Sequence, residues 1–399
     1  MRGTGAIFVL SSVTTGQQGP VAAWVSTAGW ATAAQRVLGD AWIATPAGVV
    51  EADEARRRAS HPRRSTVSRP PWRRKLPTVM KTAAKDVRQR HRAGRFDVDP
   101  VGPWLDHDIT FVLQRHDLFQ TAGLDLARAL DAPSVLFVPA LVVWESSQWA
   151  VSRPGWANWL ERLGEHPALR GTDLVACGSE VVAEQVKHLG VGDDRILVTP
   201  TGVDIDLFAN RPDRDAVRRR LGLTDRFVVG WVGSFRRFHA VEQAVEAMKE
   251  IDNGTLLMVG DGPERARIKE LAKDRGVAAR FTGTVPHREV PDYLAAMDVA
   301  LVLASPDHSF HYSPLKLAEY LAAGLPVVVP EVAQPADRLA DGVDALFVPP
   351  GDARALSVTL RRLHTDPAER ERLGAAARST AEARFLWDNE VRRISSAVG

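Results

Sequence analysis

Short apolar runs alternate along this chain with longer segments whose apolar residues recur at helical spacing. Each run has the length of a strand buried in a parallel sheet, and the alternation is typical of βαβ units, in which a helix connects two parallel strands. The expected strands are residues 6–10, 41–44, 109–113, 135–138, 174–176 and 196–199 in the first half, and 227–232, 255–259, 280–282, 299–303, 326–329 and 345–348 in the second. The pattern predicts the α/β class, with two doubly wound, Rossmann-like domains.

The domain boundary is expected within residues 201–226, a polar stretch that contains Gly202 and ends in a burst of charge. A chain of 399 residues has room for two or three domains. We expect an N-terminal domain over residues 1–205, a C-terminal domain over 206–380, and a helical segment over 381–399 that returns to the N-terminal domain.

Near the C-terminus, Asp366, Pro367 and Glu369 have the spacing of a helix start. They supply a capping carboxylate, a proline at the first helical position and a Glu that reaches back to the cap. We expect a helix to begin there and to break near residues 385–388.

Cysteine content and hydropathy exclude several classes of protein. The single Cys177 excludes a disulfide framework and any cysteine-based zinc or iron–sulfur cluster, and it fits a reducing compartment. No apolar run approaches the roughly 20 residues of a spanning helix, and the run at 6–10 is too short for the core of a signal peptide. We therefore expect a cytoplasmic protein.

The net charge of +2 hides a strong asymmetry. Residues 55–95 contain fifteen Lys and Arg but one acid, Asp86, and prolines up to Pro77 break any long helix before about Thr78. One interpretation is a solvated insertion loop. The other is an electrostatic dock for anionic lipid, a phosphorylated acceptor or nucleic acid, with Trp72 as an interfacial anchor. Nucleic acid is the least favoured, because no nucleic-acid-binding motif is present.

Ligands bind open α/β sheets beyond the carboxyl ends of the strands, so the loops that follow strands are the candidate site. The loop around Gly16 and Gly19 precedes an Ala-rich helix and lets backbone amides approach an anion, although any tight strand-to-helix turn favours Gly. The loop at 233–239 places Arg236 and Arg237 before a helix, which suits a diphosphate leaving group. The alternative is a solvated pair of arginines.

Two further regions contain candidate site residues. Residues 259–263 and 281–287 contain glycine turns, and residues 313–328 place Lys316 three residues before Glu319 at the start of an expected helix. These two side chains either pair with each other or serve a nucleotide. In the second case the first helical turn faces phosphate, and Glu319 accepts hydrogen bonds from two ribose hydroxyls.

Together these motifs, from about residue 195 to 378, resemble a family 4 retaining glycosyltransferase of GT-B architecture, in which two Rossmann-like domains face each other across a cleft. The resemblance is carried by Pro200-Thr201-Gly202-Val203-Asp204 with Phe208, the Gly233-Ser234-Phe235 loop, the turns at 259–263 and 281–287, and Ser313-Pro314-Leu315-Lys316-Leu317-Ala318-Glu319-Tyr320, a variant of the family motif. Residues 114–119 and 122–124 resemble the equivalent region of members that carry this variant.

The resemblance implies a hexosyltransferase that uses UDP or GDP as its leaving group, with no cofactor. It implies that Glu319 holds the ribose and that backbone near Val285 meets the base. The candidate catalytic residues are His311, Arg236 and Lys316. The implied donor-binding residues are Gly16, Gly19, Gly233, Ser234, Arg236, Arg237, His239, Val285, Pro314, Leu315, Lys316, Leu317 and Glu319.

The sequence departs from the family pattern at three points. His311 stands where many members have the first acid of a Glu-x7-Glu pair, Ser234 and His239 replace an Arg-x4-Lys pair, and Thr201 replaces an Asn. The two histidines are either neutral packing residues or partial cations near phosphate. Because of these departures, an alternative is that the protein is an inactive or unusual member of the family.

No metal is expected to be obligatory. Residues 97–99 and 204–206 mimic the Asp-x-Asp metal motif of the other glycosyltransferase architecture, but the first follows the basic tract and the second belongs to the interdomain loop.

The acceptor is expected on the N-terminal domain, which is the less family-like half and carries nine of the eleven tryptophans. The candidates are His116, Glu145 and Trp149. The tryptophans from 144 to 159 either form an acceptor platform or pack as core.

We therefore expect a bacterial-type retaining glycosyltransferase that moves a sugar to a hydroxyl of a glycan, lipid-linked or small-molecule acceptor, peripheral at the inner membrane surface if residues 55–95 dock there. A diphosphate leaves readily once its charge is neutralised, and it can accept the acceptor proton. The alternatives are a GT-B nucleotide-sugar epimerase, for which no carboxylates placed for proton abstraction are identified, and a catalytically silent partner protein.

Overall fold

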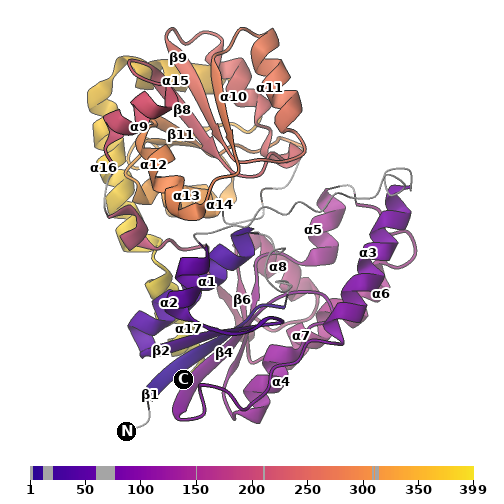
Figure 1. Cartoon of the computed structure of the whole chain (residues 1–399). Helices are drawn as coiled ribbons and strands as arrows, with labels where there is room; N and C mark the ends of the chain where they lie inside the picture. The colour runs from indigo at the N-terminus through magenta and orange to yellow at the C-terminus, as the bar shows by residue number, and fades with distance from the viewer. Residues whose placement is uncertain are drawn as a thin grey trace. The chain divides into compact units, whose positions relative to one another are not determined.

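The chain folds into two compact α/β units (Figure 1). The computed structural model describes residues 3–11, 21–59, 77–149, 151–209, 212–307, 310 and 314–399. Unit 1 covers Met1–Thr201 and Trp387–Gly399, and unit 2 covers Gly202–Phe310 and Pro314–Leu386. Each unit contains one sheet with helices on both faces, so the prediction of two Rossmann-like domains is confirmed. The assignment of residues 1–205 to an N-terminal domain, 206–380 to a C-terminal domain and 381–399 to a returning helical segment stays a prediction.

The sheet of unit 1 has the order β3-β2-β1-β4-β5-β6-β7. The strands are β1 (Gly3–Val9), β2 (Asp40–Thr45), β3 (Gly48–Glu51), β4 (His107–Arg115), β5 (Ser134–Val138), β6 (Leu174–Cys177) and β7 (Ile196–Val198). All neighbours pair in parallel except β2 and β3, which form an antiparallel hairpin. The edge strand β3 was not predicted, because its four residues bury only Val50 and lack a continuous apolar run.

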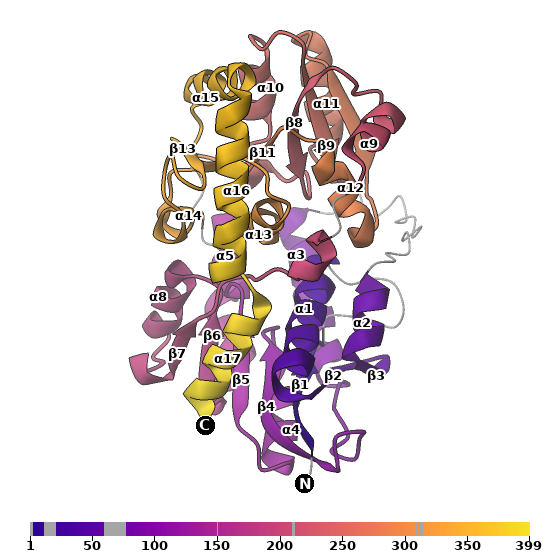
Figure 2. The same cartoon turned by 90° about the vertical axis from the view of Figure 1, so that its left-hand side faces the viewer.

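The helices of unit 1 cover both faces of this sheet, with α1 and α17 on one face and α4 on the other (Figure 2). The helices are α1 (Val21–Leu38), α2 (Ala52–Ala59), α3 (Thr78–Ala93), α4 (Ala122–Ala129), α5 (Val142–Gln148), α6 (Ala157–Leu160), the π-helix η2 (Glu161–Glu165), α7 (His166–Gly171), α8 (Glu180–His188), the short η3 (Asp193–Arg195) and α17 (Trp387–Val398). Trp387 of α17 packs against Trp30 of α1, with ring centroids 4.9 Å apart. The C-terminal helix therefore completes the core of unit 1.

The sheet of unit 2 is entirely parallel, in the order β10-β9-β8-β11-β12-β13. The strands are β8 (Phe227–Val232), β9 (Gly254–Val259), β10 (Ala279–Gly283), β11 (Val299–Leu301), β12 (Val327–Pro330) and β13 (Leu346–Val348). These are the six strands expected from the second half of the sequence. The side chains of β8, β9, β11 and β12 are almost wholly buried, which explains why these strands appear as continuous apolar runs, whereas the edge strand β10 is only partly buried.

Helices of unit 2 also form two layers, with α10, α11 and α15 on one face and α12, α13 and α16 on the other (Figures 1 and 2). The helices are η4 (Ile205–Phe208), α9 (Arg214–Leu221), η5 (Arg237–His239), α10 (Glu242–Met248), α11 (Arg265–Asp274), η6 (His287–Glu289), α12 (Val290–Ala295), α13 (Leu315–Ala322), α14 (Ala333–Arg338), α15 (Ala353–Thr365) and α16 (Pro367–Arg384).

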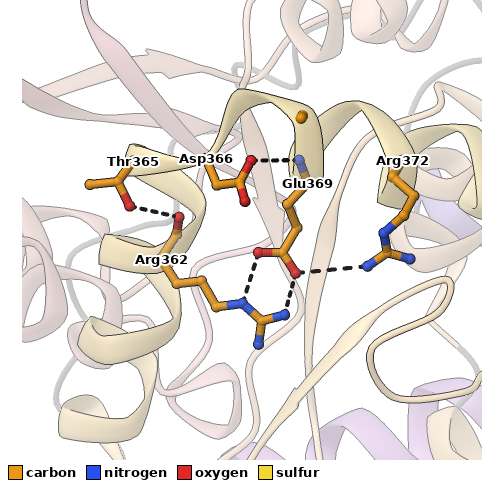
Figure 3. Close-up of a pocket in the computed structure, with 6 residues that line it drawn as sticks. Arg362, Thr365, Asp366, Glu369 and Arg372 are labelled. Atoms are coloured by element: carbon orange, nitrogen blue, oxygen red, sulfur yellow. Dashed lines mark hydrogen bonds and ion pairs between the residues drawn. The ribbon is translucent and has the colours of Figure 1, made fainter.

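The start of α16 confirms part of the predicted cap and corrects the rest. The helix begins at Pro367, and Oδ1 of Asp366 accepts a hydrogen bond from the backbone N–H of Glu369 at 2.9 Å. The carboxylate of Glu369 does not return to the cap; it pairs with Arg362 at 2.7 Å and with Arg372 at 3.7 Å (Figure 3). The predicted break is also present, since α16 ends at Arg384 and α17 begins at Trp387.

The same residues line a shallow pocket at the junction of α15 and α16 (Figure 3). Its carboxylates and guanidinium groups are already paired with one another or with the helix start, so the pocket is explained by the joining of two helices.

Candidate functional site

In unit 2 the chain order reverses between β8 and β11, and ligands of doubly wound sheets bind beyond the carboxyl ends of strands at such a switch point. The loop after β8, the turns after β9 and β10, and the start of α13 belong to this edge of the sheet. They contain four of the motifs singled out from the sequence.

Three glycines pack these loops together backbone to backbone. The N–H of Gly233 donates to the carbonyl oxygen of Val259, and the N–H of Gly260 donates to that of Gly283, both at 2.9 Å. A Cβ atom on Gly260 would lie 2.0 Å from the carbonyl oxygen of Gly233, and Gly260 has a φ of +124°. Only glycine fits there, so motifs far apart in the sequence form one continuous loop cluster.

The loop after β8 has one inward and one outward side. Phe235 is buried in the core, while Ser234, Arg236 and Arg237 are exposed. His239 is buried beside Trp231, with ring centroids 5.5 Å apart. Burial, followed by the charges of Lys316 and Arg236, lowers the pKa of His239 well below its usual value, so this histidine is neutral.

Lys316 supplies a cation to the same loop from the first turn of α13. Its Nζ lies 4.2 Å from the centroid of the Trp231 ring, and a Cβ atom on Gly233 would be 2.7 Å from it. Part of the side chain reaches the surface, but protein surrounds the ammonium group. Burial lowers the pKa of Lys316 to about 7, and the attraction of Glu319 acts in the opposite direction.

Glu319 is buried on α13 and pairs with His287, not with Lys316. Nε2 of His287 lies 2.6 Å from Oε1 of Glu319. Burial alone would lower the pKa of His287, but the charge and hydrogen bond of Glu319, with the charge of Asp204, raise it above its usual value. Next to Glu319, the hydroxyl oxygen of Tyr320 accepts a hydrogen bond from the N–H of Val232 at 2.7 Å, which ties α13 to the end of β8.

The other predicted donor residues fall into two groups. Val285 lies in the loop after β10, two residues before His287, while Pro314 and Leu317 are buried and Leu315 is partly buried at the start of α13. Gly16, Gly19 and His311 lie outside the described residues, as does Trp72.

In unit 1, the acceptor-side candidates gather around α5. His116 follows β4, and its buried Nε2 lies 3.3 Å from Oε1 of Glu165. The same oxygen accepts hydrogen bonds from the N–H groups of Val142 and Val143 at 2.6 and 3.3 Å, so Glu165 caps the helix that carries Glu145. Trp149 follows this helix directly and is partly buried.

Several residues of these sites were missed from the sequence. His287 was quoted within a motif but given no role, and Glu165 belongs to no motif. Arg115 is a third: its guanidinium lies at the end of β4, where burial lowers its pKa to about 10 despite the charges of Asp117 and Glu145. A charged residue at the carboxyl end of a predicted strand was the available signal for Arg115.

Helix α3 belongs to the basic stretch, residues 55–95, and is anchored through the single acid of that stretch. Asp86 of α3 is buried and pairs with Arg153 at 2.8 Å, and Trp156 donates to the same carboxylate at 3.0 Å. The helix begins at Thr78, as the prolines predict. Trp156 is therefore a structural partner, while Trp159 is 41% exposed with Arg90 lying over its ring at 5.0 Å.

Comparison with known proteins identifies the class. Residues 226–366 match the model described as Glycosyl transferases group 1, and residues 39–207 match the Glycosyltransferase Family 4 model. The chain therefore carries glycosyltransferase family domains in both halves.

Curated relatives are glycosyltransferases. The chain is 30% identical to the lipopolysaccharide core biosynthesis glycosyltransferase LpsD of Rhizobium meliloti, over 57% of this chain and 64% of that protein. It is 29% identical to a D-inositol 3-phosphate glycosyltransferase of Thermomonospora curvata, over 76% and 71%. It is 34% identical to the 2-deoxystreptamine N-acetyl-D-glucosaminyltransferase of Streptomyces fradiae, over 53% and 52%. The matched region thus spans from about half to about seven tenths of these relatives.

Solved structures show the same fold. Anabaena HepE in complex with UDP superposes with a TM-score of 0.65 at 17% identity, covering 98% of both chains. WaaG, a glycosyltransferase involved in lipopolysaccharide biosynthesis, gives 0.63 at 17% identity, covering 98% of this chain and 99% of that one. The fold is that of GT-B glycosyltransferases.

The described residues contain neither a membrane-spanning helix nor a group of metal ligands. None of their helices is long and apolar enough to cross a bilayer. No group of three or more His, Cys, Asp or Glu among them could hold a metal ion.

Proposed function

We propose that this protein is a retaining hexosyltransferase that moves a sugar from a nucleotide diphosphate sugar to an acceptor hydroxyl without an obligatory metal ion. One observation carries the proposal: the first two turns of α13 bring a lysine ammonium and a buried carboxylate to the glycine loops at the switch point. Lys316 suits a diphosphate, and Glu319 suits the two hydroxyls of a ribose. The glycosyltransferase relatives support it.

The chemistry that these residues provide is electrostatic. Lys316 lies against the Gly233 loop, and Arg236 and Arg237 are exposed on the same loop. Together with backbone amides at the start of α13, they neutralise the departing diphosphate. The departing phosphate then accepts the acceptor proton, so the protein need not provide a pair of carboxylates. His311 remains a further catalytic candidate.

The acceptor binds unit 1 in this proposal, at the partly buried Glu145 and Trp149, while His116 is buried against Glu165 and supports the group from within. The names of the relatives include a lipopolysaccharide core, D-inositol 3-phosphate and 2-deoxystreptamine, all of which carry hydroxyl groups. We propose a glycan, lipid-linked or small-molecule acceptor of this hydroxyl-rich kind.

The basic stretch 55–95 contacts an anionic membrane in this proposal, from the cytoplasmic side. Helix α3 exposes Lys85, Arg88 and Arg92, and it also exposes the apolar Met80 and Val87 by 56% and 70%. Since its one acid is buried against Arg153, the exposed face of α3 combines cations with apolar side chains, as interfacial helices do.

The donor site is tested by the affinity for UDP and GDP, measured by calorimetry. Replacing Glu319 with Ala should weaken binding by roughly tenfold or more, because the ribose hydroxyls lose a charged acceptor. The matched control is Glu250→Ala, which removes a surface carboxylate that pairs with Arg361. Unchanged affinity in Glu319→Ala would refute the ribose role.

A further inference from the structure

The proposed ribose carboxylate is held by a second side chain from a different loop. Oε1 of Glu319 lies 2.6 Å from Nε2 of His287, and the exposed fractions of the two side chains are 5% and 18%. His287 begins η6, in the loop after β10, and Glu319 lies 32 positions later on α13. The pair therefore joins two of the motifs that meet at the switch point.

A buried carboxylate needs such a partner. Taking its charge out of water costs several kcal/mol unless an opposite charge and hydrogen bonds replace the lost solvent. Lys316 lies one turn earlier on the same helix, but its ammonium is placed over Trp231. His287 contacts Glu319 directly, and its imidazole can carry the opposite charge.

We infer that His287 is a positioning residue for the nucleotide: its imidazole holds one oxygen of Glu319, so that the other oxygen is presented to the ribose. An ionised carboxylate has two oxygens and about four acceptor sites, so one imidazole does not exhaust it. The inference rests on the proposed ribose role of Glu319, and it adds a residue that also connects the ribose to the loop of Val285, where the base is expected.

Protonation of His287 strengthens this arrangement. The charges that act on the imidazole are those of Glu319 on α13 and Asp204 before η4, while the sequence neighbours Arg288 and Glu289 pair with each other at 3.8 Å. The two carboxylates that act on His287 favour the charged imidazole despite its burial, and a charged donor holds a carboxylate more strongly than a neutral one. Nucleotide affinity should therefore fall as the pH rises through the raised pKa of His287.

The test compares two substitutions of His287, with UDP as the first probe and GDP as the second. His287→Leu removes the donor and should weaken nucleotide binding by about tenfold. His287→Gln keeps a neutral donor, so it should restore most of the affinity and lose the histidine part of the pH dependence between pH 6 and 9. Arg280→Gln, an exposed change in β10, is the control, and thermal melting checks that each variant is folded.

A spectroscopic measurement tests the pair without any nucleotide. The pKa of His287, followed by NMR and assigned with His287→Gln, should fall in Glu319→Gln, because the charge that raises it is removed. An unchanged pKa would overturn the pairing.

The two proposals can fail separately. If Glu319→Ala loses nucleotide binding while His287→Leu binds like wild type, then His287 does not position the carboxylate and the ribose role of Glu319 stands. If Glu319→Ala itself binds like wild type, the proposed donor site is wrong and the role of His287 falls with it.

Discussion

At the scale of single residues, the candidate donor site is built from groups whose charge depends on burial. The family pattern that the sequence resembles implies a lysine where this chain has His239, which is buried and neutral. Lys316 instead brings an ammonium group to the same loop from α13. The ammonium group at this loop therefore comes from α13 and not from position 239.

Lys316 should make diphosphate binding depend on pH. Its pKa is about 7 in the unliganded protein, and an anion binds the charged form better. The affinity for UDP or GDP should therefore be full below pH 7 and fall as the pH rises; a one-unit rise of the pKa on binding corresponds to about a tenfold loss.

Lys316→Arg is the control for this pH dependence, since an arginine stays charged throughout the range. It should flatten the profile of affinity against pH measured by calorimetry, leaving only the ionisation of the nucleotide and of His287. A profile identical to wild type would show that Lys316 does not face the diphosphate.

The sequence could name Glu319, Lys316 and the glycines, because each belongs to a local motif with its own chemistry. It could not show that Glu319 pairs with His287, since these residues lie 32 positions apart and meet only when β10 and α13 are packed at one edge of a sheet. The contact between Glu165 and His116, which lie 49 positions apart, could not be predicted for the same reason.

At the scale of elements, apolar runs predicted most of the strands, because strands inside a parallel sheet are buried on both faces. The hairpin strand β3 was missed, since an edge strand with one buried side chain has no such run. Helix α3 shows a different limit: its start at Thr78 followed from proline chemistry, whereas its attachment through Asp86 depends on Arg153, 67 positions away.

The attachment of α3 should be sensitive to loss of the buried carboxylate. Asp86→Asn leaves Arg153 buried without a counter-charge, which typically costs about 3–5 kcal/mol. Chemical denaturation should show this loss of stability. Asp125→Asn breaks an exposed pair with Arg128 and should cost at most about 0.5 kcal/mol; equal effects of the two changes would contradict the structural role of Asp86.

At the scale of the whole molecule, positive charge is divided between two tasks. The proposed donor site uses a few cations, Lys316, Arg236 and Arg237, which lie on unit 2. The much larger cationic stretch 55–95 belongs to unit 1 and lies outside every donor motif. In the proposed function, the stretch docks at an anionic membrane and the donor chemistry belongs to unit 2.

Membrane docking should depend on salt and on α3. Co-sedimentation with vesicles that contain anionic lipid should be strong at low salt and weak at 0.5 M salt, where charges are screened within about 4 Å. Changing Lys85, Arg88 and Arg92 to Gln should reduce binding at low salt by roughly a hundredfold, because each cation contributes about 1 kcal/mol near the surface. Changing Lys269, Lys273 and Arg361, exposed on unit 2, is the control. Failure to bind at low salt would exclude this role.

The central claim is that the protein transfers sugar from a nucleotide diphosphate donor. It is tested most directly by incubating the protein with a panel of UDP- and GDP-sugars and hydroxyl acceptors, and measuring the nucleoside diphosphate released. We predict acceptor-dependent release from at least one donor, a product with the anomeric configuration of the donor, and loss of release in Glu319→Ala. Nucleotide binding without release from any donor would contradict the claim.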